Sequence, residues 1–207
     1  MTSTVFPHET PAICDAATVI LLRHTAGQTR VLMGQRGRSA VFMPGKFVFP
    51  GGAVDPADFD VPAPELATPV CRARLENEAT PDLASAILVA ARRELQEETG
   101  LSLRPDAEMK FVFRAITPPK RPRRFDARFL LCDAADVVED PDDFSRAEDE
   151  LSHLQWVSLP KAVTLDLPFV TRLVLAEVKA LAGLSGPPET VPFYDHRGPV
   201  GRIRSLL

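Results

Sequence analysis

Apolar and polar positions divide the chain into short strands separated by turns. Residues 16–22 form a continuous apolar run that suits a buried strand. A turn at Ala26–Gln28 leads to a second strand over residues 30–36, and together they predict a hairpin within a mixed sheet. Alternating segments over residues 110–116 and 127–132 predict two further strands.

Two longer segments have helical periodicity. The first is predicted over residues 81–98, because Thr80 can cap its start, Pro81 suits its first turn, and Gly100 stands where a left-handed terminating residue is wanted. The second lies within residues 165–184 and should cover the other face of the sheet.

The helix predicted over residues 81–98 has an apolar stripe and an acidic face. The stripe can face a core and consists of Ile87, Ala91 and Leu95. The acidic face has i, i+3, i+4 spacing and consists of Glu94, Glu97 and Glu98. Like charges at this spacing cost roughly 0.2–0.5 kcal/mol per pair. Arg93 is expected to reach only one glutamate at a time, so Mg²⁺ or Mn²⁺ is the better counter-charge. A solvated acidic face without a ligand is the alternative.

Composition limits the classes of protein and partner. A chain of 207 residues that is 45% hydrophobic can bury one core, which predicts one domain with a core over about 12–184. We expect an insertion at about 53–79 and a proline-broken tail over 185–207, in which residues 194–197 and 202–204 could add a strand or a subunit contact. The net charge of −4 argues against nucleic acid or an anionic membrane as a partner. No apolar run approaches 18 residues and no signal peptide is evident, so a soluble, cytoplasmic protein is expected.

A nine-residue motif ends the acidic helix. Residues 93–101 read Arg-Glu-Leu-Gln-Glu-Glu-Thr-Gly-Leu. They match the second half of the Nudix box, G-x5-E-x7-R-E-U-x-E-E-x-G-U with U apolar, and Phe49-Pro50-Gly51-Gly52 resembles the strand and turn that introduce it. Gly52 lies about twenty-seven positions further from Arg93 than the box prescribes, which implies an insertion. Ser85 stands eight residues before Arg93, where the box has a glutamate, so the usual partner of the box arginine is expected to be absent.

The resemblance implies a fold and a metal-assisted reaction. The fold would be α+β, an α/β/α sandwich around a central mixed β-sheet. Water would attack a phosphorus of a substrate in which a nucleoside diphosphate is linked to another moiety, with Mg²⁺ or Mn²⁺ as cofactor. Arg93 would orient the glutamates or steady the phosphate. The implied metal ligands are the side chains of Glu94, Glu97 and Glu98 and the backbone carbonyl of Gly52. Glu97 is also counted as catalytic.

Residues 154–162 resemble the late strand and the following helix start that are common in Nudix folds. In several Nudix enzymes a loop glutamate before this strand activates water or binds an additional metal. Glu148 and Glu150 are the matching positions here, within an acidic run over residues 137–154. The alternatives are that these acids are merely solvated, or that His153 is the base.

A second resemblance concerns the substrate. Leu32, Arg36, Gly45 and residues 49–52 fall in register on a signature that precedes the box in coenzyme A diphosphatases of the Nudix motif 19-like branch. Three signature positions differ and are occupied by Gly34, Gly37 and Val41. The resemblance implies coenzyme A or an acyl derivative as substrate, cleaved to 3′,5′-ADP and 4′-phosphopantetheine, with Arg36 as a substrate contact.

A basic loop follows the strand predicted over residues 110–116. Coenzyme A carries a 3′-phosphate, which cations could bind through charge-assisted hydrogen bonds. The candidate substrate-binding cations of this loop are Lys120, Arg121, Arg123 and Arg124. The alternative is a solvated loop with no ligand.

Other functions remain compatible with the sequence. One is a Nudix pyrophosphatase for ADP-ribose, dinucleotides or nucleotide sugars, and another is a non-catalytic nucleotide-binding Nudix domain. The expected partner is a small-molecule nucleotide. A homodimer is a further hypothesis, because many Nudix proteins are dimers.

Overall fold

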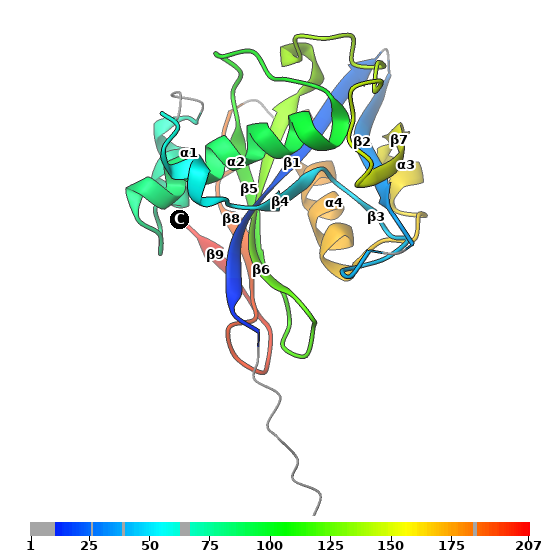
Figure 1. Cartoon of the computed structure of the whole chain (residues 1–207). Coiled ribbons are helices and arrows are strands. Elements are labelled where there is room, and N and C mark those ends of the chain that lie inside the picture. Colours follow the sequence, from blue (N-terminus) through cyan, green and yellow to red (C-terminus); the bar gives the residue numbers. More distant parts are fainter. Residues whose placement is uncertain (1–10, 26, 39, 63–66, 184–185) are drawn as a thin grey trace, which may run out of the picture.

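A mixed sheet forms the centre of the structure, with helices on both of its faces (Figure 1). The computed structural model describes residues 11–25, 27–38, 40–62, 67–183 and 186–207. Within those ranges the sheet has nine strands: β1 (Ile13–Thr25), β2 (Gln28–Arg36), β3 (Phe47–Val48), β4 (Gly51–Ala53), β5 (Lys110–Ile116), β6 (Arg124–Asp133), β7 (Leu151–Ser158), β8 (Val191–Asp195) and β9 (Arg202–Leu206).

The main path of the sheet runs β3-β2-β1-β6-β5-β8-β9, and β7 pairs with β2. The predicted hairpin is confirmed, because β1 and β2 are antiparallel and Thr25 lies opposite Gln28. Ala26, in the predicted turn, lies outside the described residues. On its other edge β1 runs parallel to β6 over ten residue pairs, from Ile13 opposite Arg124 to Leu22 opposite Asp133.

β1 also pairs with two strands along a single edge. Its first half pairs with β4, where Ala17 lies opposite Gly52, and its second half pairs with β2, where Leu22 lies opposite Val31. Between β2 and β4 the chain forms β3, which pairs antiparallel with β2. The glycines of β4 lie beneath the long helix that follows (Figure 1).

That helix is α2 (Pro81–Thr99), and it ends one residue beyond the prediction. The Thr80 hydroxyl accepts a hydrogen bond from the Leu83 amide at 3.2 Å, and Gly100 follows the helix with φ 75°. Both ends are therefore set by local sequence, as expected from the capping residues.

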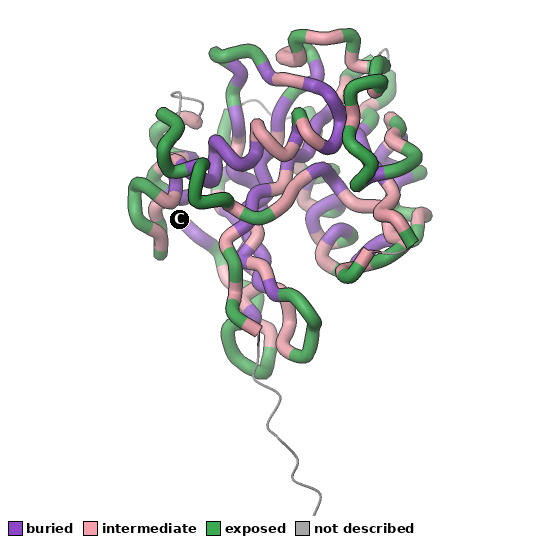
Figure 2. The backbone as a smooth tube through the Cα atoms, viewed as in Figure 1, coloured by how far each residue is buried: buried purple, intermediate pink, exposed green. Residues whose placement is uncertain are grey.

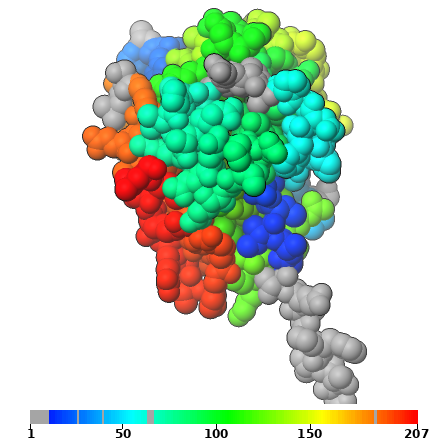
Figure 3. All heavy atoms as spheres, turned by 90° about the vertical axis from the view of Figure 1, so that its left-hand side faces the viewer, coloured from blue at the N-terminus to red at the C-terminus, as the bar shows by residue number. Residues whose placement is uncertain are grey.

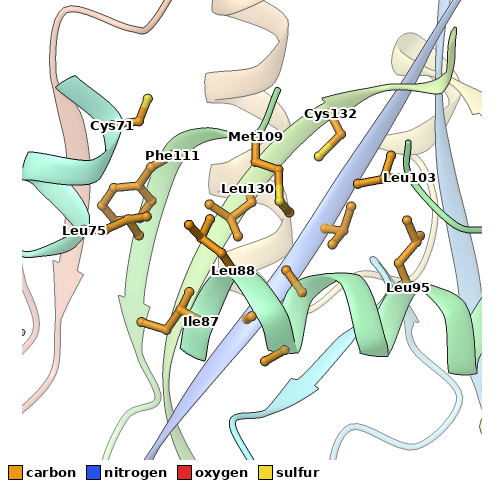
Figure 4. Close-up of a cluster of buried hydrophobic side chains, with 14 of the residues drawn as sticks. Cys71, Leu75, Ile87, Leu88, Leu95, Leu103, Met109, Phe111, Leu130 and Cys132 are labelled. Atoms are coloured by element: carbon orange, nitrogen blue, oxygen red, sulfur yellow. The ribbon is translucent and has the colours of Figure 1, made fainter. Parts of the chain in front are cut away.

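Two apolar clusters fill the space on either side of the sheet, which confirms the predicted sandwich. One lies under α2, where Ile87, Ala91 and Leu95 are fully buried. Figure 4 shows Ile87, Leu88 and Leu95 pointing from α2 toward the strands. The other cluster lies under α4 (Phe169–Leu181), within the segment predicted to be helical. In Figure 2 the buried parts of the chain follow the central strands and the inner side of α2.

Within the segment expected to be a tail, the alternative of an added strand is confirmed, and the core extends beyond residue 184. β8 runs parallel to β5, with Phe193 beside Arg114, and β9 pairs antiparallel to β8. Val191, Phe193 and Leu206 are at most 2% exposed, so this hairpin contributes to the core. The sequence left a strand and a subunit contact open as alternatives, because β8 is held by a partner far away in sequence, which local patterning cannot show.

The predicted insertion contains two short helices, η1 (Pro56–Phe59) and α1 (Pro69–Leu75). α1 buries Cys71 and Leu75 in the core, and Arg74 donates hydrogen bonds to the carbonyls of Pro188 and Glu189. Figure 3 shows this part of the chain lying against the C-terminal strands. A further short helix, α3 (Leu159–Ala162), follows β7 as predicted. Within the described ranges, none of the helices combines the length and apolarity needed to cross a bilayer.

Candidate active site

Glu98 lies at the end of α2 with its carboxylate buried against β4. The side chain is 2% exposed, and Oε2 accepts a hydrogen bond from the Gly51 amide at 2.7 Å. Oε1 is buried without a partner among the described atoms. Burial raises the pKa of Glu98 to about 8, and the nearby carboxylates of Glu150 and Glu94 add to the rise.

Position 52 must be a glycine because the Glu94 carboxylate lies so close to it. A Cβ at position 52 would lie 2.5 Å from Oε1 of Glu94, so any side chain there would displace the carboxylate. The turn between β3 and β4 therefore brings backbone without a side chain against the glutamate. Burial raises the pKa of Glu94 above its ordinary value, Arg93 opposes the rise, and Glu97 and Glu150 add to it.

Arg93 contacts three carboxylates at once. Its Nη1 lies 2.7 Å from Glu94 Oε1 and 2.9 Å from Glu97 Oε2. Its Nε and Nη2 donate to the two oxygens of Asp58 at 3.0 and 2.9 Å. The expectation that Arg93 reaches only one glutamate at a time is therefore wrong. The hydrogen bond with Asp58 is the main cause of a raised pKa for Arg93, which keeps the guanidinium charged.

Asp58 is the arginine's partner that the sequence analysis missed. It is 2% exposed, lies on η1, and stands six residues after Gly52, which is the spacing of the first box glutamate. Counting backward from Arg93 across the insertion leads to Ser85, whereas counting forward from Gly52 leads to Asp58. Burial opposes ionisation of Asp58, but hydrogen bonds from Arg93 and from the Asp55 amide outweigh it and lower its pKa.

The loop before β7 brings one of its two candidate glutamates to this cluster. Glu150 accepts a hydrogen bond from Arg36 Nη2 at 2.5 Å and lies near enough to Glu94 and Glu98 to raise their pKa values. Glu148 is held through its backbone, because its amide donates to the Glu97 carbonyl at 2.8 Å while its side chain is exposed. His153 is exposed, with Nδ1 3.1 Å from Ser152 Oγ.

A cavity of about 320 Å³ opens beside the glutamates. Gly52, Glu94 and Glu150 line it, and so does Arg36. Its apolar walls include Phe42 and Phe125, whose rings pack edge to face with centroids 5.3 Å apart. The cavity therefore joins an acidic region to an aromatic one, as a site for an organic molecule with a charged linkage would require.

Residues 80–178 match the model of the NUDIX domain. Over these residues the chain is similar to Nudix hydrolases. The match covers the helix that carries Arg93 and its glutamates and extends through the loop of Glu150.

Relatives and solved structures agree with this assignment. The chain is 29% identical over 164 residues to a Caenorhabditis elegans protein named nudix hydrolase 7, covering 72% of this chain and 52% of that protein. It therefore spans about half the length of this relative. A NUDIX hydrolase from Alicyclobacillus acidocaldarius is similar in structure with a TM-score of 0.62 and 25% identity, covering 86% and 99% of the two chains. A MutT NUDIX hydrolase from Burkholderia pseudomallei shares the fold with a TM-score of 0.52 and 20% identity, covering 81% and 98%.

The residues of this Nudix site fit a hard divalent cation. Glu98 offers a buried oxygen without a hydrogen-bond partner, and Glu94 adds a second carboxylate that lies where a side chain at Gly52 would be. An all-oxygen donor set of this charge is typical of Mg²⁺ or Mn²⁺ sites. Among the described residues, no three or more His, Cys, Asp or Glu side chains are already grouped around one point, since Arg93 engages Glu94 and Glu97.

The basic loop of this Nudix domain is divided by the fold. Arg123 lines the cavity, whereas Lys120 and Arg121 are exposed outside it. Arg124 is 4% exposed, and its guanidinium donates to the carbonyls of Thr117 and His196 at 3.0 and 2.6 Å. Of the four cations, the fold therefore directs one to the cavity and one to the protein interior.

Proposed function

We propose that this protein hydrolyses the diphosphate linkage of a nucleoside diphosphate derivative. Coenzyme A or an acyl-coenzyme A is the favoured substrate, and the products are 3′,5′-ADP and 4′-phosphopantetheine or its acyl form. The observation that carries the proposal is the cavity beside the glutamates, which joins Glu94 and Glu150 to two arginines, Arg36 and Arg123.

Glu94, Glu97, Glu98 and the carbonyl of Gly52 are the groups that would hold Mg²⁺ or Mn²⁺. When bound, such an ion lowers the pKa of an attacking water and neutralises charge on the phosphates. Arg93 positions Glu94 and Glu97, and it is itself held by Asp58. The chain thus fixes the acidic side chains before a substrate binds, which reduces the reorganisation needed during reaction.

Glu150 is the proposed base. It lines the cavity, whereas Glu148 does not, and Arg36 holds its carboxylate. Glu150 would accept the proton of the attacking water as the water oxygen bonds to phosphorus. The bridging P–O bond breaks at the same centre, and the leaving phosphate carries away the electron pair.

Support for coenzyme A comes from the arrangement of its signature residues. Arg36, Phe49, Gly51 and Gly52 are separated by up to sixteen positions in sequence, yet all of them line one cavity. Arg123 adds a cation on the wall formed by the basic loop. A substrate with a phosphate beyond its diphosphate would use this additional positive charge.

The first test is product release from coenzyme A, dephospho-coenzyme A, ADP-ribose, NADH and a nucleotide sugar, with Mg²⁺ and separately with Mn²⁺. Preference for coenzyme A over its dephospho form is expected. Turnover of only the other substrates would remove coenzyme A from the proposal, and no turnover of any substrate would favour a nucleotide-binding role.

The second test is Glu98→Gln, with Glu177→Gln on α4 as the matched control. Glu177 is a partly buried glutamate that does not line the cavity. Glu98→Gln should lose nearly all turnover without a lower thermal midpoint, because the amide oxygen can still accept the Gly51 hydrogen bond and the amide is neutral at every pH. Glu177→Gln should keep its turnover. Unchanged hydrolysis by Glu98→Gln would exclude Glu98 as a metal ligand.

A further inference from the structure

The first turn of α4 forms part of the cavity wall. Pro168, Val170 and Thr171 line the cavity, and α4 continues from them for a total of 13 residues. Pro168 is the N-cap and supplies no side-chain hydrogen bond to the helix. Because the first amides of a helix have no acceptor within it, this end presents unsatisfied donors and the positive end of the helix dipole.

Thr171 adds a hydroxyl at the same place. It is 6% exposed and lines the cavity, and its hydroxyl has no hydrogen-bond partner within the described ranges. Thr99, a helical threonine elsewhere, instead donates to the carbonyl of Leu95 at 2.5 Å. The Thr171 hydroxyl is not among the buried unpartnered atoms, so it is accessible, and because Thr171 lines the cavity it can donate to a ligand there.

Charge around the cavity is distributed unequally between its two arginines. Arg36 is neutralised by Glu150, whereas Arg123 has no ion pair with any residue that the structure describes. Asp166, the acid nearest in sequence to the start of α4, is itself paired with Lys46 at 2.6 Å. The charge available for a ligand away from the glutamates is therefore positive.

We propose that the first turn of α4, the Thr171 hydroxyl and Arg123 form an anion subsite for a phosphate monoester. This phosphate would be a second anionic group of the substrate, separate from the diphosphate that lies near the glutamates. The identification of that group as the 3′-phosphate of coenzyme A rests on the proposed function. Of the basic loop, Arg123 alone takes part in the subsite.

The test measures binding by calorimetry, so that it does not depend on turnover. The probes are 3′,5′-ADP, which carries phosphates on the 3′ and 5′ hydroxyls, and 5′-AMP, which lacks the 3′-phosphate. Wild-type protein should bind 3′,5′-ADP more tightly. Thr171→Val should weaken 3′,5′-ADP roughly tenfold, the size expected for a lost hydrogen bond to a charged group, and should change 5′-AMP less than twofold. Thr171→Ser should retain the affinity of the wild type.

Variants of the loop separate the subsite from general attraction of anions. Arg123→Gln should reduce the preference for 3′,5′-ADP, whereas Arg121→Gln should not, and Lys179→Ala at the far end of α4 is the control for folding. Equal weakening of both nucleotides by Thr171→Val would overturn the proposal, as would equal wild-type affinities or equal effects at Arg121 and Arg123. If the nucleotides are discriminated but coenzyme A is not hydrolysed, the proposed reaction fails and the subsite stands.

Discussion

At the scale of single residues, Asp58 determines how Arg93 is held. A carboxylate that meets a guanidinium through two parallel hydrogen bonds fixes the plane of the arginine as well as its position. The third nitrogen of Arg93 then faces Glu94 and Glu97. Asp58 does not line the cavity, so its effect on chemistry must pass through Arg93.

Asp58→Asn should lower kcat roughly 10–100-fold, the range found when a residue that orients metal ligands is lost. The effect on KM should be smaller, because Asp58 does not contact the cavity. Steady-state kinetics with the preferred substrate measure both constants. Asp60→Asn is the matched control, since Asp60 is exposed and lies two residues away. Equal effects of the two substitutions would contradict the positioning role.

The residue scale also shows where sequence reasoning succeeds and fails. Spacing alone identified Glu94, Glu97 and Glu98, because a helix imposes a fixed angle per residue. Spacing failed for Asp58, because the insertion separates it from Arg93 by 35 positions. Composition could not show that Arg123 faces the cavity while Arg124 faces the protein interior. Adjacent positions on a strand, or at its end, point to opposite sides.

At the scale of elements, the residues at the C-terminal end of α2 end the helix and also position the loop before β7. Gly100 adopts φ 75°, and a Cβ there would lie 2.9 Å from Cβ of Arg146. The adjoining loop is tied to the helix by the bond from the Glu148 amide to the Glu97 carbonyl. The position of Glu150 therefore depends on how closely this loop can approach α2.

Gly100→Ala should destabilise the protein by about 1–2 kcal/mol through its left-handed backbone, and by more through the contact with Arg146. Gly183→Ala provides the comparison, because Gly183 also has positive φ (95°) but an added Cβ would meet nothing within 4 Å. Denaturant unfolding of both variants measures the difference. Turnover should fall in Gly100→Ala only. Equal losses of stability would show that the loop adjusts without cost.

The β8–β9 hairpin contains a cluster of ion pairs, and their contribution to the stability of the protein should depend on pH. The hydrogen bond from Arg197 lowers the pKa of Asp195 to about 2, against an ordinary value of 3.8. A carboxyl group with a lower pKa in the folded state stabilises the protein fully above its unfolded pKa and loses that contribution as pH falls toward the folded value. The shift corresponds to about 2 kcal/mol.

Asp195→Asn should therefore reduce the free energy of unfolding by a constant amount from pH 7 down to about pH 5, and by less as pH falls from 4 toward 2. Urea unfolding of wild type and variant across this pH range measures the difference between them. A difference that stays constant down to pH 2 would show that the ion pair with Arg197 does not cause the effect.

At the scale of the whole molecule, the sequence predicted the sandwich but not the full width of its sheet. The layers follow from α2, from the segment containing α4 and from the apolar strands, all of which have local signals. The positions of β8 and β4 depend on partners distant in sequence, Arg114 for β8 and Ala17 for β4. Local patterning contains no information about such pairings.

Deletion of residues 190–207 should prevent stable folding, because it uncovers β5 and removes Phe193 and Leu206 from the core. Loss of one large buried aromatic side chain already costs roughly 3–5 kcal/mol, a large part of the stability of an ordinary domain. Circular dichroism and a thermal melt of the shortened chain test this. A cooperative transition near that of the full chain would show that the hairpin is dispensable.

The parallel pairing of β1 with β6 affects how the chain is made in the cell. Ile13 pairs with Arg124, which lies 111 positions later in the chain, so the hydrogen bonds between β1 and β6 can form only after that residue has been synthesised. During synthesis, which proceeds from the N-terminus, only β2 and β4 can pair with β1 at first. The apolar stretch Val19–Leu22 then has one uncovered edge until β6 leaves the ribosome. This stretch is where a chaperone would be needed and where newly made chains would associate wrongly.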